Sequence, residues 1–361
     1  MRTSATRQGL SSVPQAAGDR DGRFSAGIPY LYGPFGKEII LGPIDTLLSP
    51  VILFFALGAL AAAVRSDLAI PEAMAKAMSL YLMAAIGLKG GVQVATAGFH
   101  GEMLLTGAVG IALSFGLPFI AFAALRNFGK LDGLNSGAVA AHYGSVSVVT
   151  FATASEVLTR GGIPPAGYMV AVLALMETPA IVSGLLLAQR GNKTQQRAGG
   201  HLWREVFLNG SVVLLLGAFA IGAIVGKTKY EPIAPMFTGL WSGVLCLFLL
   251  DMGLIAVRRL RESKAVTARL AILGIVLPLV NGTIGALAGA AIGLETGSAA
   301  ALSILAASAS YIAVPAAMRL AMPKADAGLY LSMSLAITFP FNIIVGIPLF
   351  TALATALTRA S

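Results

Sequence analysis

The sequence has one cysteine, Cys246, and three histidines that lie far apart, His100, His142 and His201. A single cysteine excludes an internal disulfide, and no Cys/His spacing in the chain is typical of a metal site. The chain also lacks a glycine-rich phosphate-binding loop with its lysine, which argues against ATP as a source of energy. No Ser-His-Asp or paired-carboxylate arrangement can be argued from the spacing, so the sequence indicates no enzyme.

Charged residues are scarce as well, at 11% of 361 residues, and apolar residues take their place. Hydrophobic residues make up 57% of the chain, the mean hydropathy is +0.82, and there are 42 glycines. Glycine-rich apolar runs on this scale are typical of packed transmembrane helices, so we predict a polytopic membrane protein. The net charge of +9 belongs to loops between apolar runs, which argues for a lipid bilayer and against nucleic acid as a partner.

Residues 1–40 are polar, rich in Gly, Ser and Arg, and without hydrophobic periodicity, which predicts a disordered tail. This tail does not look like a cleavable signal, because no apolar core follows its first charges closely. Beyond it, ten apolar runs are long enough to cross a bilayer. Their predicted bounds are 44–64, 71–96, 101–125, 133–158, 165–189, 206–226, 232–257, 270–294, 297–320 and 326–354.

A short phrase occurs twice, each time at the entrance of a matching apolar run. Gly133–Gly137 (GLNSG) leads into a run containing Ser145–Ser147, and Gly293–Gly297 (GLETG) leads into a run containing Ser308–Ser310. The phrases lie 160 residues apart and the serine pairs 163 residues apart. Internal duplication of a hydrophobic half is a signature of secondary transporters, whose substrate sites form where the two halves meet.

The runs divide into a first half at 41–189 and a second at 206–361, joined by a basic linker at 190–205. Because each half has an odd number of spans, the second half must insert upside down, which gives an inverted repeat. One set of loops and span ends holds fifteen Lys and Arg residues, and the opposite set holds four. The first set is therefore predicted to be cytoplasmic, with both termini external. The five basic residues of the tail argue the other way, but four internal loops agree with this orientation.

The centre of the fourth run reads Ala141–Thr150 (AHYGSVSVVT), with Gly144 beside several hydroxyl side chains. This composition suits a helix that breaks inside the membrane, where protein or a watery cavity satisfies the freed backbone groups. The second half of such a helix would direct its free N–H groups and positive dipole end into the bilayer centre, forming an anion site without a basic side chain. Ser308–Tyr311, followed by Pro315, predicts the same kind of broken helix and N-terminal anion site in the ninth run.

Two such N-termini facing each other would hold a small anion, and carbonyl and hydroxyl oxygens on the far side could hold Na⁺. The plainer interpretation is packing, because Ser, Thr and Gly are common at helix–helix contacts in membranes. Recurrence at equivalent points of a duplication favours a site.

Ionisable residues inside membrane spans are costly and are therefore functional candidates. Asp251 and Lys89 fall in equivalent runs, where they could pair or could each reach a span end, and structural roles explain them as well as transport roles do. Glu177, directly before Thr178 and Pro179, is a better candidate for a cation ligand or an ion-coupled gate.

Neutral oxygens for Na⁺ could also come from Asn281 and Thr283, although a helix–helix hydrogen bond explains these two residues equally well. Three further acidic residues lie close to predicted span ends, where we expect them to be solvated: Glu102, Asp132 and Glu156.

At these positions the sequence resembles the sodium-dependent bicarbonate permease family, of the cyanobacterial sodium/bicarbonate symporter type. The resemblance covers about residues 44–350 and is carried by five phrases: Ile86–Gly91, His142–Phe151, Met176–Gly184, Leu249–Arg259 and Ser308–Pro315. It implies ten spans in two inverted halves, a trimer, and a core that moves against a scaffold. It also implies that broken helices four and nine cross at the midplane, where a small anion binds with Na⁺. In the family, a PII-like regulator can bind the cytoplasmic face.

Carried onto this chain, the resemblance implies an anion site made by Tyr143, Gly144, Ser145, Ser147, Ser308, Ala309, Ser310 and Tyr311. The residues that we expect to serve Na⁺ are Ser145, Thr150, Ser310, Glu177 and Asp251. A site without an obligatory Arg suits a monovalent anion better than a dicarboxylate.

We therefore expect Na⁺-coupled symport of bicarbonate across a bacterial inner membrane. Two alternatives stay open: cation/proton exchange through Asp251, Lys89 or Glu177, and a non-transporting membrane sensor.

Overall fold

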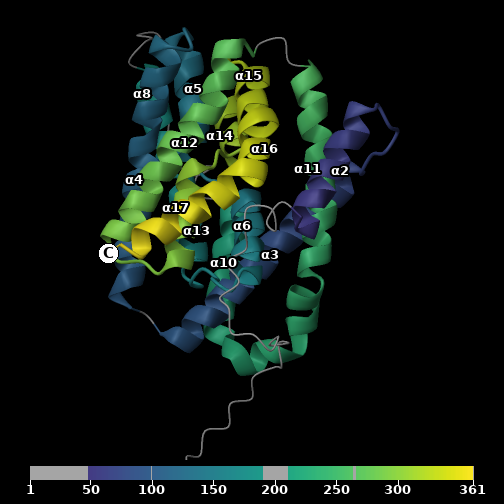
Figure 1. The fold of residues 1–361 in the computed structure, drawn as a ribbon, viewed down its shortest axis with the longest axis vertical. Coiled ribbons are helices and arrows are strands. Elements are labelled where there is room, and N and C mark those ends of the chain that lie inside the picture. The colour runs from purple at the N-terminus through teal and green to yellow at the C-terminus, as the bar shows by residue number, and fades with distance from the viewer. Residues whose placement is uncertain (1–47, 99, 190–209, 263–265, 361) are drawn as a thin grey trace, which may run out of the picture. The chain divides into compact units, whose positions relative to one another are not determined.

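A computed structural model describes residues 48–98, 100–189, 210–262 and 266–360. The predicted tail (1–40) and linker (190–205) lie outside these residues. Every regular element in the described ranges is a helix, and none is a strand (Figure 1). Six helical segments there are long and apolar enough to cross a membrane: Glu72–Ala97, Gly101–Asn127, Met169–Ala188, Val212–Ile233, Ala268–Ala291 and Ala327–Thr358. The predicted all-α, multi-pass membrane protein is confirmed at this level.

Each apolar run predicted before the last one forms either one continuous helix or two shorter helices in the structure. The continuous helices are α2 (Pro50–Ala63), α3 (Glu72–Ala97), α4 (Gly101–Asn127), α10 (Gly210–Tyr230), α11 (Trp241–Glu262) and α12 (Ala268–Ala291). The divided runs form α5 (Gly133–Gly144) and α6 (Val148–Arg160), α7 (Met169–Glu177) and α8 (Pro179–Gln189), and α13 (Thr296–Ala307) and α14 (Ala313–Ala321).

The last run, from α15 (Ala327–Leu331) to α17 (Ile347–Thr358), stays helical but changes its winding. Between them lie η3 (Ser332–Thr338), α16 (Phe339–Phe341) and η4 (Asn342–Gly346), of which η3 and η4 are π-helical. The largest difference from the predicted bounds is at 232–257, where α11 begins only at Trp241. Pro232 and Pro235 explain this, because proline donates no backbone hydrogen bond and confines the chain there to the short turns η1 (Glu231–Ile233) and η2 (Pro235–Gly239).

Close backbone contact between helices depends on glycine in two helix pairs. In the pair α2–α11, a Cβ added to Gly58 would lie 2.0 Å from the Leu250 carbonyl oxygen, and one added to Gly253 would lie 2.2 Å from the Phe55 carbonyl oxygen. In the pair α3–α10, a Cβ at Gly91 would lie 2.0 Å from the Phe219 carbonyl oxygen. Small residues allow membrane helices to pack backbone against backbone, which explains part of the high glycine content.

Arg261 joins the ends of α2 and α11. Its guanidinium donates hydrogen bonds to the Ala62 and Ala63 carbonyl oxygens at 2.8 and 2.6 Å, at the C-terminal end of α2. Positive charge near free carbonyls is favourable at a helix C-terminus.

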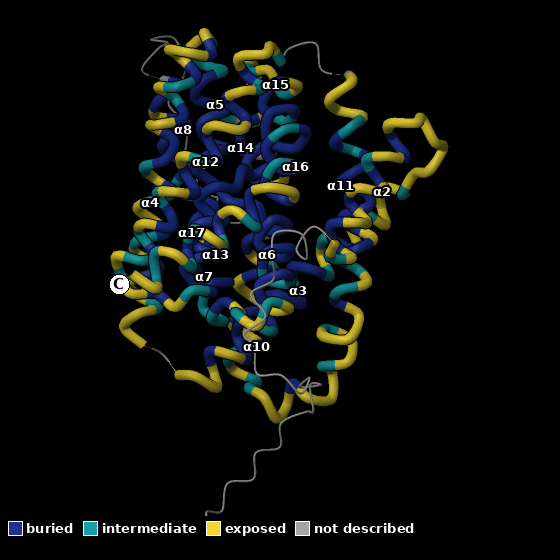
Figure 2. Tube along the Cα trace, in the orientation of Figure 1, coloured by how far each residue is buried: buried dark blue, intermediate teal, exposed yellow. Residues whose placement is uncertain are grey.

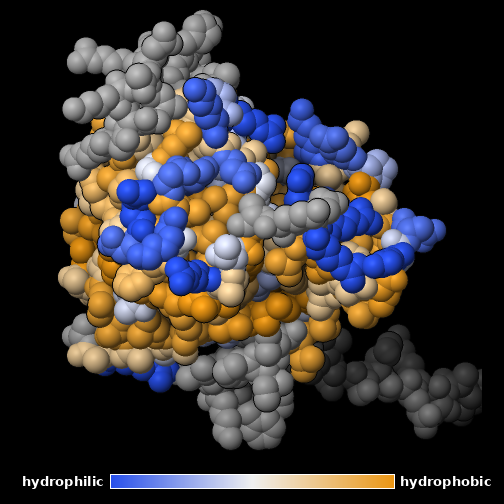
Figure 3. Space-filling view, turned by 90° about the horizontal axis from the view of Figure 1, so that it is seen from above, coloured by the Kyte–Doolittle hydropathy of each residue, from blue (hydrophilic) through white to orange (hydrophobic). Residues whose placement is uncertain are grey.

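Figure 3 shows the end of the molecule at which α5 and α15 begin. Hydrophilic residues gather on this end, and hydrophobic residues lie around them.

Burial is greatest in the helices next to the breaks. Residues 136–154 are all buried, and α13 is buried from Gly297 to Ala307. Figure 2 shows α5, α6 and α13 as mainly buried tube, whereas the outer sides of α2 and α4 are exposed. The polar residues singled out from the sequence in the fourth and ninth runs are therefore enclosed by protein.

Asp132 is the N-cap of α5 and anchors the start of this buried helix. Its carboxylate accepts hydrogen bonds from the Asn135 main-chain and side-chain N–H groups at 2.8 and 2.7 Å, and Asn135 Oδ1 accepts from the Asp326 N–H at 2.8 Å at the start of α15. Burial raises the pKa of Asp132, but the hydrogen bonds from Asn135 outweigh it, so the pKa lies below its usual value.

Asp132→Ala is expected to lower the free energy of unfolding by about 1 kcal/mol, the usual value of an N-cap. Because the folded pKa is depressed, this contribution is complete above the ordinary carboxyl pKa of about 4 and is lost as the pH falls below it. Thermal unfolding in detergent across pH should show the two proteins converging in acid. A difference that stays constant with pH would contradict the charged cap.

Candidate functional site

The fourth predicted run breaks directly after Gly144, as expected from the sequence. α5 ends there, and Ser145 and Ser147 are extended, with φ/ψ of −82/168° and −110/112°. Ser147 is the N-cap of α6, and its Oγ accepts a hydrogen bond from the Thr150 N–H at 3.2 Å. The Phe151 N–H bonds to the Ser147 carbonyl at 3.0 Å. Because the first N–H groups of a helix have no partner within it, those of Val148 and Val149 are left for a ligand.

The ninth run breaks at the equivalent place, and the two breaks cross. α13 ends at Ala307 and α14 begins at Ala313. The Ser147 N–H donates to Ser308 Oγ at 2.9 Å, and the Ser310 N–H donates to the His142 carbonyl at 2.9 Å. Two segments that are far apart in the sequence are thus joined by reciprocal hydrogen bonds. The N-terminal ends of α6 and α14 come to the same place.

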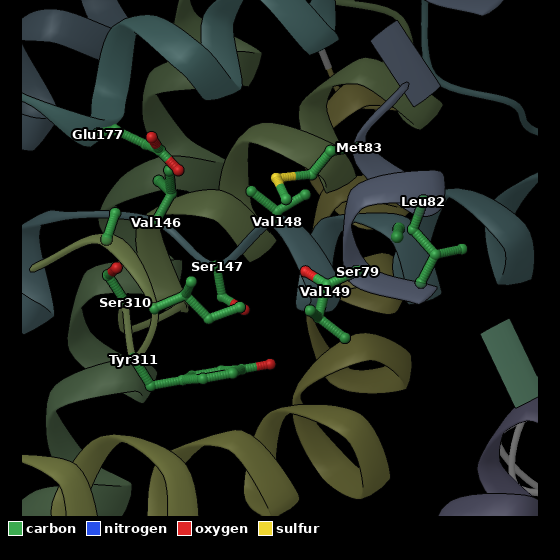
Figure 4. Close-up of a pocket in the computed structure, with 13 residues that line it drawn as sticks. Ser79, Leu82, Met83, Val146, Ser147, Val148, Val149, Glu177, Ser310 and Tyr311 are labelled. Atoms are coloured by element: carbon green, nitrogen blue, oxygen red, sulfur yellow. The ribbon is translucent and has the colours of Figure 1, made fainter. Parts of the chain in front are cut away.

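A cavity of about 20 Å³ lies at this crossing (Figure 4), above the 10–15 Å³ or so that one water requires. Its lining comes from α3, α6, both breaks, the end of α7 and the start of α14: Ser79, Leu82, Met83, Val146, Ser147, Val148, Val149, Ala152, Glu177, Ser310, Tyr311, Ile312 and Ala313. No Lys, Arg or His of the described chain is among these residues. One lining atom, Glu177 Oε2, is buried without a hydrogen-bond partner among the described residues.

Glu177 reaches the cavity because the helix around it is interrupted. Pro179 follows closely, and the Ser114 hydroxyl on α4 inserts into the hydrogen-bond ladder: it accepts from the Ala180 N–H at 3.2 Å and donates to the Met176 carbonyl at 2.6 Å. Insertion of a side chain between residues four apart is a recognised cause of a kink. The Ile181 N–H turns to Thr178, which frees the Glu177 carbonyl to accept from Ser145 Oγ at 3.1 Å.

Prolines in α4 and α12 each free a backbone carbonyl, and the one freed in α12 supports the broken helix. Because proline has no N–H, Pro118 and Pro278 leave the carbonyls of Ser114 and Gly274 without their helical partners. The Gly274 carbonyl accepts from Thr338 Oγ1 at 2.6 Å, and Thr338 Oγ1 bonds to the Tyr143 hydroxyl at 2.7 Å. These contacts hold the end of α5 from a different side than the cavity.

Comparison with known protein families matches residues 50–355 to the Na⁺-dependent bicarbonate transporter superfamily. The chain belongs to this superfamily. No curated protein matches the chain. Membership and the six candidate membrane spans together identify a multi-pass membrane protein of a transporter family, and they indicate transport rather than catalysis.

The structure of this superfamily member brings some predicted site residues to the cavity and places others behind it. Ser147, Ser310, Tyr311 and Glu177 line the cavity. The others at the crossing are buried but do not line it: Tyr143, Gly144, Ser145, Thr150, Ser308 and Ala309. Asp251 is buried on α11, where its Oδ2 has no partner among the residues that the structure describes, and it is not part of the lining.

Lys89 and Asp251 do not form an ion pair among the described residues. Lys89 Nζ instead lies 5.0 Å from the centre of the Trp241 ring, a cation–π contact. The expectation that Glu156 is solvated was wrong, because its side chain is 12% exposed. It pairs with Arg160 at 2.7 Å and accepts from Ser242 Oγ at 2.7 Å, which joins α6 to α11. Glu102 and Asp132 are exposed as expected.

Of the two neutral candidates for Na⁺ ligands, Asn281 and Thr283, one is buried and the other is exposed. Asn281 is fully buried, and its Nδ2 donates to the Tyr143 carbonyl at 3.1 Å, whereas Thr283 is exposed and bonds to Leu279 in its own helix. The helix–helix interpretation of Asn281 therefore holds for its amide nitrogen, while its Oδ1 has no partner within the described ranges.

Sequence reasoning missed several residues that shape the site. Ser79, Leu82 and Met83 on α3 form part of the wall, and Asn342 donates to the Ala307 carbonyl at 2.9 Å at the end of α13. Asn342 could have been noticed as a polar residue inside an apolar run. Leu82 and Met83 carry no such signal, because an apolar side chain of a membrane helix looks the same whether it faces a cavity or a neighbour.

Proposed function

We propose that this protein is a secondary active transporter that carries bicarbonate into the cell by symport with Na⁺. The observation that carries the proposal is the convergence of the α6 and α14 N-termini on one cavity without a basic lining residue. Free N–H groups and positive dipole ends favour an anion, and weak distributed charge suits one negative charge better than two. Membership in the Na⁺-dependent bicarbonate transporter superfamily supports both substrates.

Na⁺ would bind in the same region because the polar side chains among its lining residues carry hydroxyl and carboxylate oxygens. Hydroxyl, carbonyl and carboxylate oxygens are the ligands that hard cations prefer. We propose that Ser145, Thr150, Ser310 and Glu177 bind Na⁺. A role of Asp251 in binding Na⁺ stays a prediction. A bound Na⁺ would offset the Glu177 charge, so that the anion binds well only when Na⁺ is present.

We also propose that residues 41–189 and 206–361 form two inverted repeats of five spans. Several pairs of features support this. Pro118 and Pro278 lie 160 residues apart in α4 and α12, and each of these helices packs against the first half of a broken helix, α5 or α13. The outer pairs α2–α11 and α3–α10 each join one proposed half to the other.

Other features implied by the family resemblance stay predictions for this chain. They are a homotrimer and a PII-like partner on the cytoplasmic face. The bacterial inner-membrane location, and the external termini that the Lys and Arg count indicates, stay predictions as well. The mass of the purified particle in lipid nanodiscs would test the trimer.

The experiment that tests the function is uptake of radiolabelled bicarbonate by proteoliposomes with and without an inward Na⁺ gradient. Symport predicts uptake that requires Na⁺ and that ends when the gradient is collapsed by an ionophore. No uptake by folded protein in either condition would refute bicarbonate as the substrate.

Ser145→Ala and Ser310→Ala are expected to raise the apparent KM for bicarbonate or Na⁺ severalfold while the protein stays in the membrane. Ser145 supports the Glu177 carbonyl, and Ser310 Oγ lies 3.4 Å from the Val314 N–H in the first turn of α14. Initial uptake rates over a range of both substrates give the two KM values. Unchanged kinetics in both variants would remove these serines from the site.

Cation/proton exchange is the second candidate, favoured by the unpaired buried oxygens of Asp251 and Glu177. It predicts Na⁺-driven proton release without any anion, which a pH-sensitive dye inside the proteoliposomes detects. Neutral substitutions at Asp251 or Glu177 should then abolish the signal.

A further inference from the structure

Glu177 provides the one carboxylate among the described residues that line the cavity. Its side chain is 2% exposed, and Oε2 is enclosed without a hydrogen-bond partner in the described part of the chain. None of the cavity's described neighbours is a Lys, Arg or His that would pair with it. An unpaired polar atom in an apolar setting costs free energy, so a persistent one indicates a group that binds there.

The position of this carboxylate is held from two sides. Ser114 inserts between Met176 and Ala180 on one side, and Ser145 bonds to the carbonyl of Glu177 itself on the other. Figure 4 shows the Glu177 side chain and the Tyr311 ring on opposite sides of the cavity, with Ser147 and Ser310 between them. A side chain on a backbone held in this way presents its oxygens at a defined place in the cavity.

The cavity therefore offers a ligand two kinds of contact. The N-termini of α6 and α14 provide N–H donors, which suit oxygens that carry negative charge. Glu177 provides an acceptor, which repels such oxygens and suits a hydrogen that can be donated. Bicarbonate has both parts: two oxygens that share its charge and one hydroxyl. Nitrate is also planar, of similar size and singly charged, but it has no hydrogen to donate.

We propose that Glu177 determines specificity by accepting a hydrogen bond from the bicarbonate hydroxyl, while the two helix N-termini hold the charged oxygens. This inference rests on the proposed transport function. It assigns to Glu177 the rejection of nitrate and other monovalent anions that lack a hydrogen. A site built to bond a substrate hydroxyl discriminates strongly against an analogue without it, because the buried partner is then left unpaired.

A Na⁺ ligand at Glu177 would explain the same unpaired oxygen, and the two roles make different predictions. A carboxylate that only binds Na⁺ affects every transported anion equally. A carboxylate that recognises the hydroxyl affects the ratio of bicarbonate to nitrate. That ratio is therefore the quantity to measure, at a saturating Na⁺ concentration.

The experiment uses the full chain in proteoliposomes, with uptake of radiolabelled bicarbonate, competition by unlabelled nitrate, and direct uptake of isotopically labelled nitrate. The unmodified protein should transport bicarbonate and be unaffected by a large excess of nitrate. In Glu177→Gln, whose amide can donate to nitrate, the bicarbonate-to-nitrate preference in kcat/KM should fall by about 100-fold or more. Glu72→Gln, the same change at the exposed start of α3, is the matched control and should leave the preference unchanged.

Glu177→Asp keeps the acceptor but withdraws it by one methylene, so it should retain part of the preference. Should Glu177→Gln fail to fold, as judged by size-exclusion chromatography, Glu177→Asp and the unmodified protein decide the question. The proposal is overturned by nitrate transport in the unmodified protein, or by folded variants that change the KM for Na⁺ while keeping the full preference. Absence of bicarbonate uptake by the unmodified protein would instead refute the proposed function.

Discussion

Gly144→Ala is expected to reduce bicarbonate uptake by about tenfold or more. A Cβ at this position would lie 2.3 and 2.4 Å from Cγ and Cδ of Pro118 and 2.8 Å from the Ser114 carbonyl oxygen. The proline ring and the backbone are rigid neighbours, so α5 must move away from α4. Overpacking of this kind costs about 1–3 kcal/mol, and the strain acts on the residue directly before the break.

The expected loss comes mainly from geometry rather than from unfolding. Displacing the end of α5 shifts Ser145 and Ser147, and with them the hydrogen bonds that join the two breaks. Initial uptake rates and thermal unfolding of the same preparation separate the two effects. Gly116→Ala on α4 is the matched control, because a Cβ there meets no atom within 4 Å. Wild-type uptake by Gly144→Ala would show that the α4–α5 contact does not position the break.

The break itself could be predicted from the sequence because its signals are local. A glycine beside serines inside a long apolar run conflicts with a continuous membrane helix, and the recurrence of the serine pair at Ser308 and Ser310 located the second break. The N-cap role of Ser147 follows from its position before the apolar residues of α6. Such features depend on a few consecutive residues, so the sequence alone is enough to predict them.

The partners of the break could not be predicted, because they depend on packing between distant helices. Ser114 looks like any small residue of an apolar run, yet its hydroxyl shapes the α7–α8 kink 62 residues later. Glu156 looked like a residue near a solvated span end, but it lies against Ser242 of α11. Sequence periodicity indicates which residues are apolar, and it does not indicate which neighbour faces each of them.

Ser114→Ala is expected to lower uptake by about tenfold with almost no loss of stability. Without the inserted hydroxyl, the Ala180 N–H and the Met176 carbonyl can bond to each other and restore the helical ladder. One helical hydrogen bond then replaces two, a net change within about 1 kcal/mol. The straightened segment carries Glu177 away from Ser145 and from its place in the cavity.

The decisive measurement combines thermal unfolding in detergent with uptake kinetics for bicarbonate and nitrate. Thr96→Ala is the control, because among the described residues the Thr96 hydroxyl bonds only to the Val92 carbonyl in its own helix. If Glu177 recognises the substrate hydroxyl, Ser114→Ala must weaken the preference for bicarbonate although it leaves the carboxylate in the chain. If uptake falls in proportion to stability and the preference is kept, Ser114 only supports the fold, and the kink does not position Glu177.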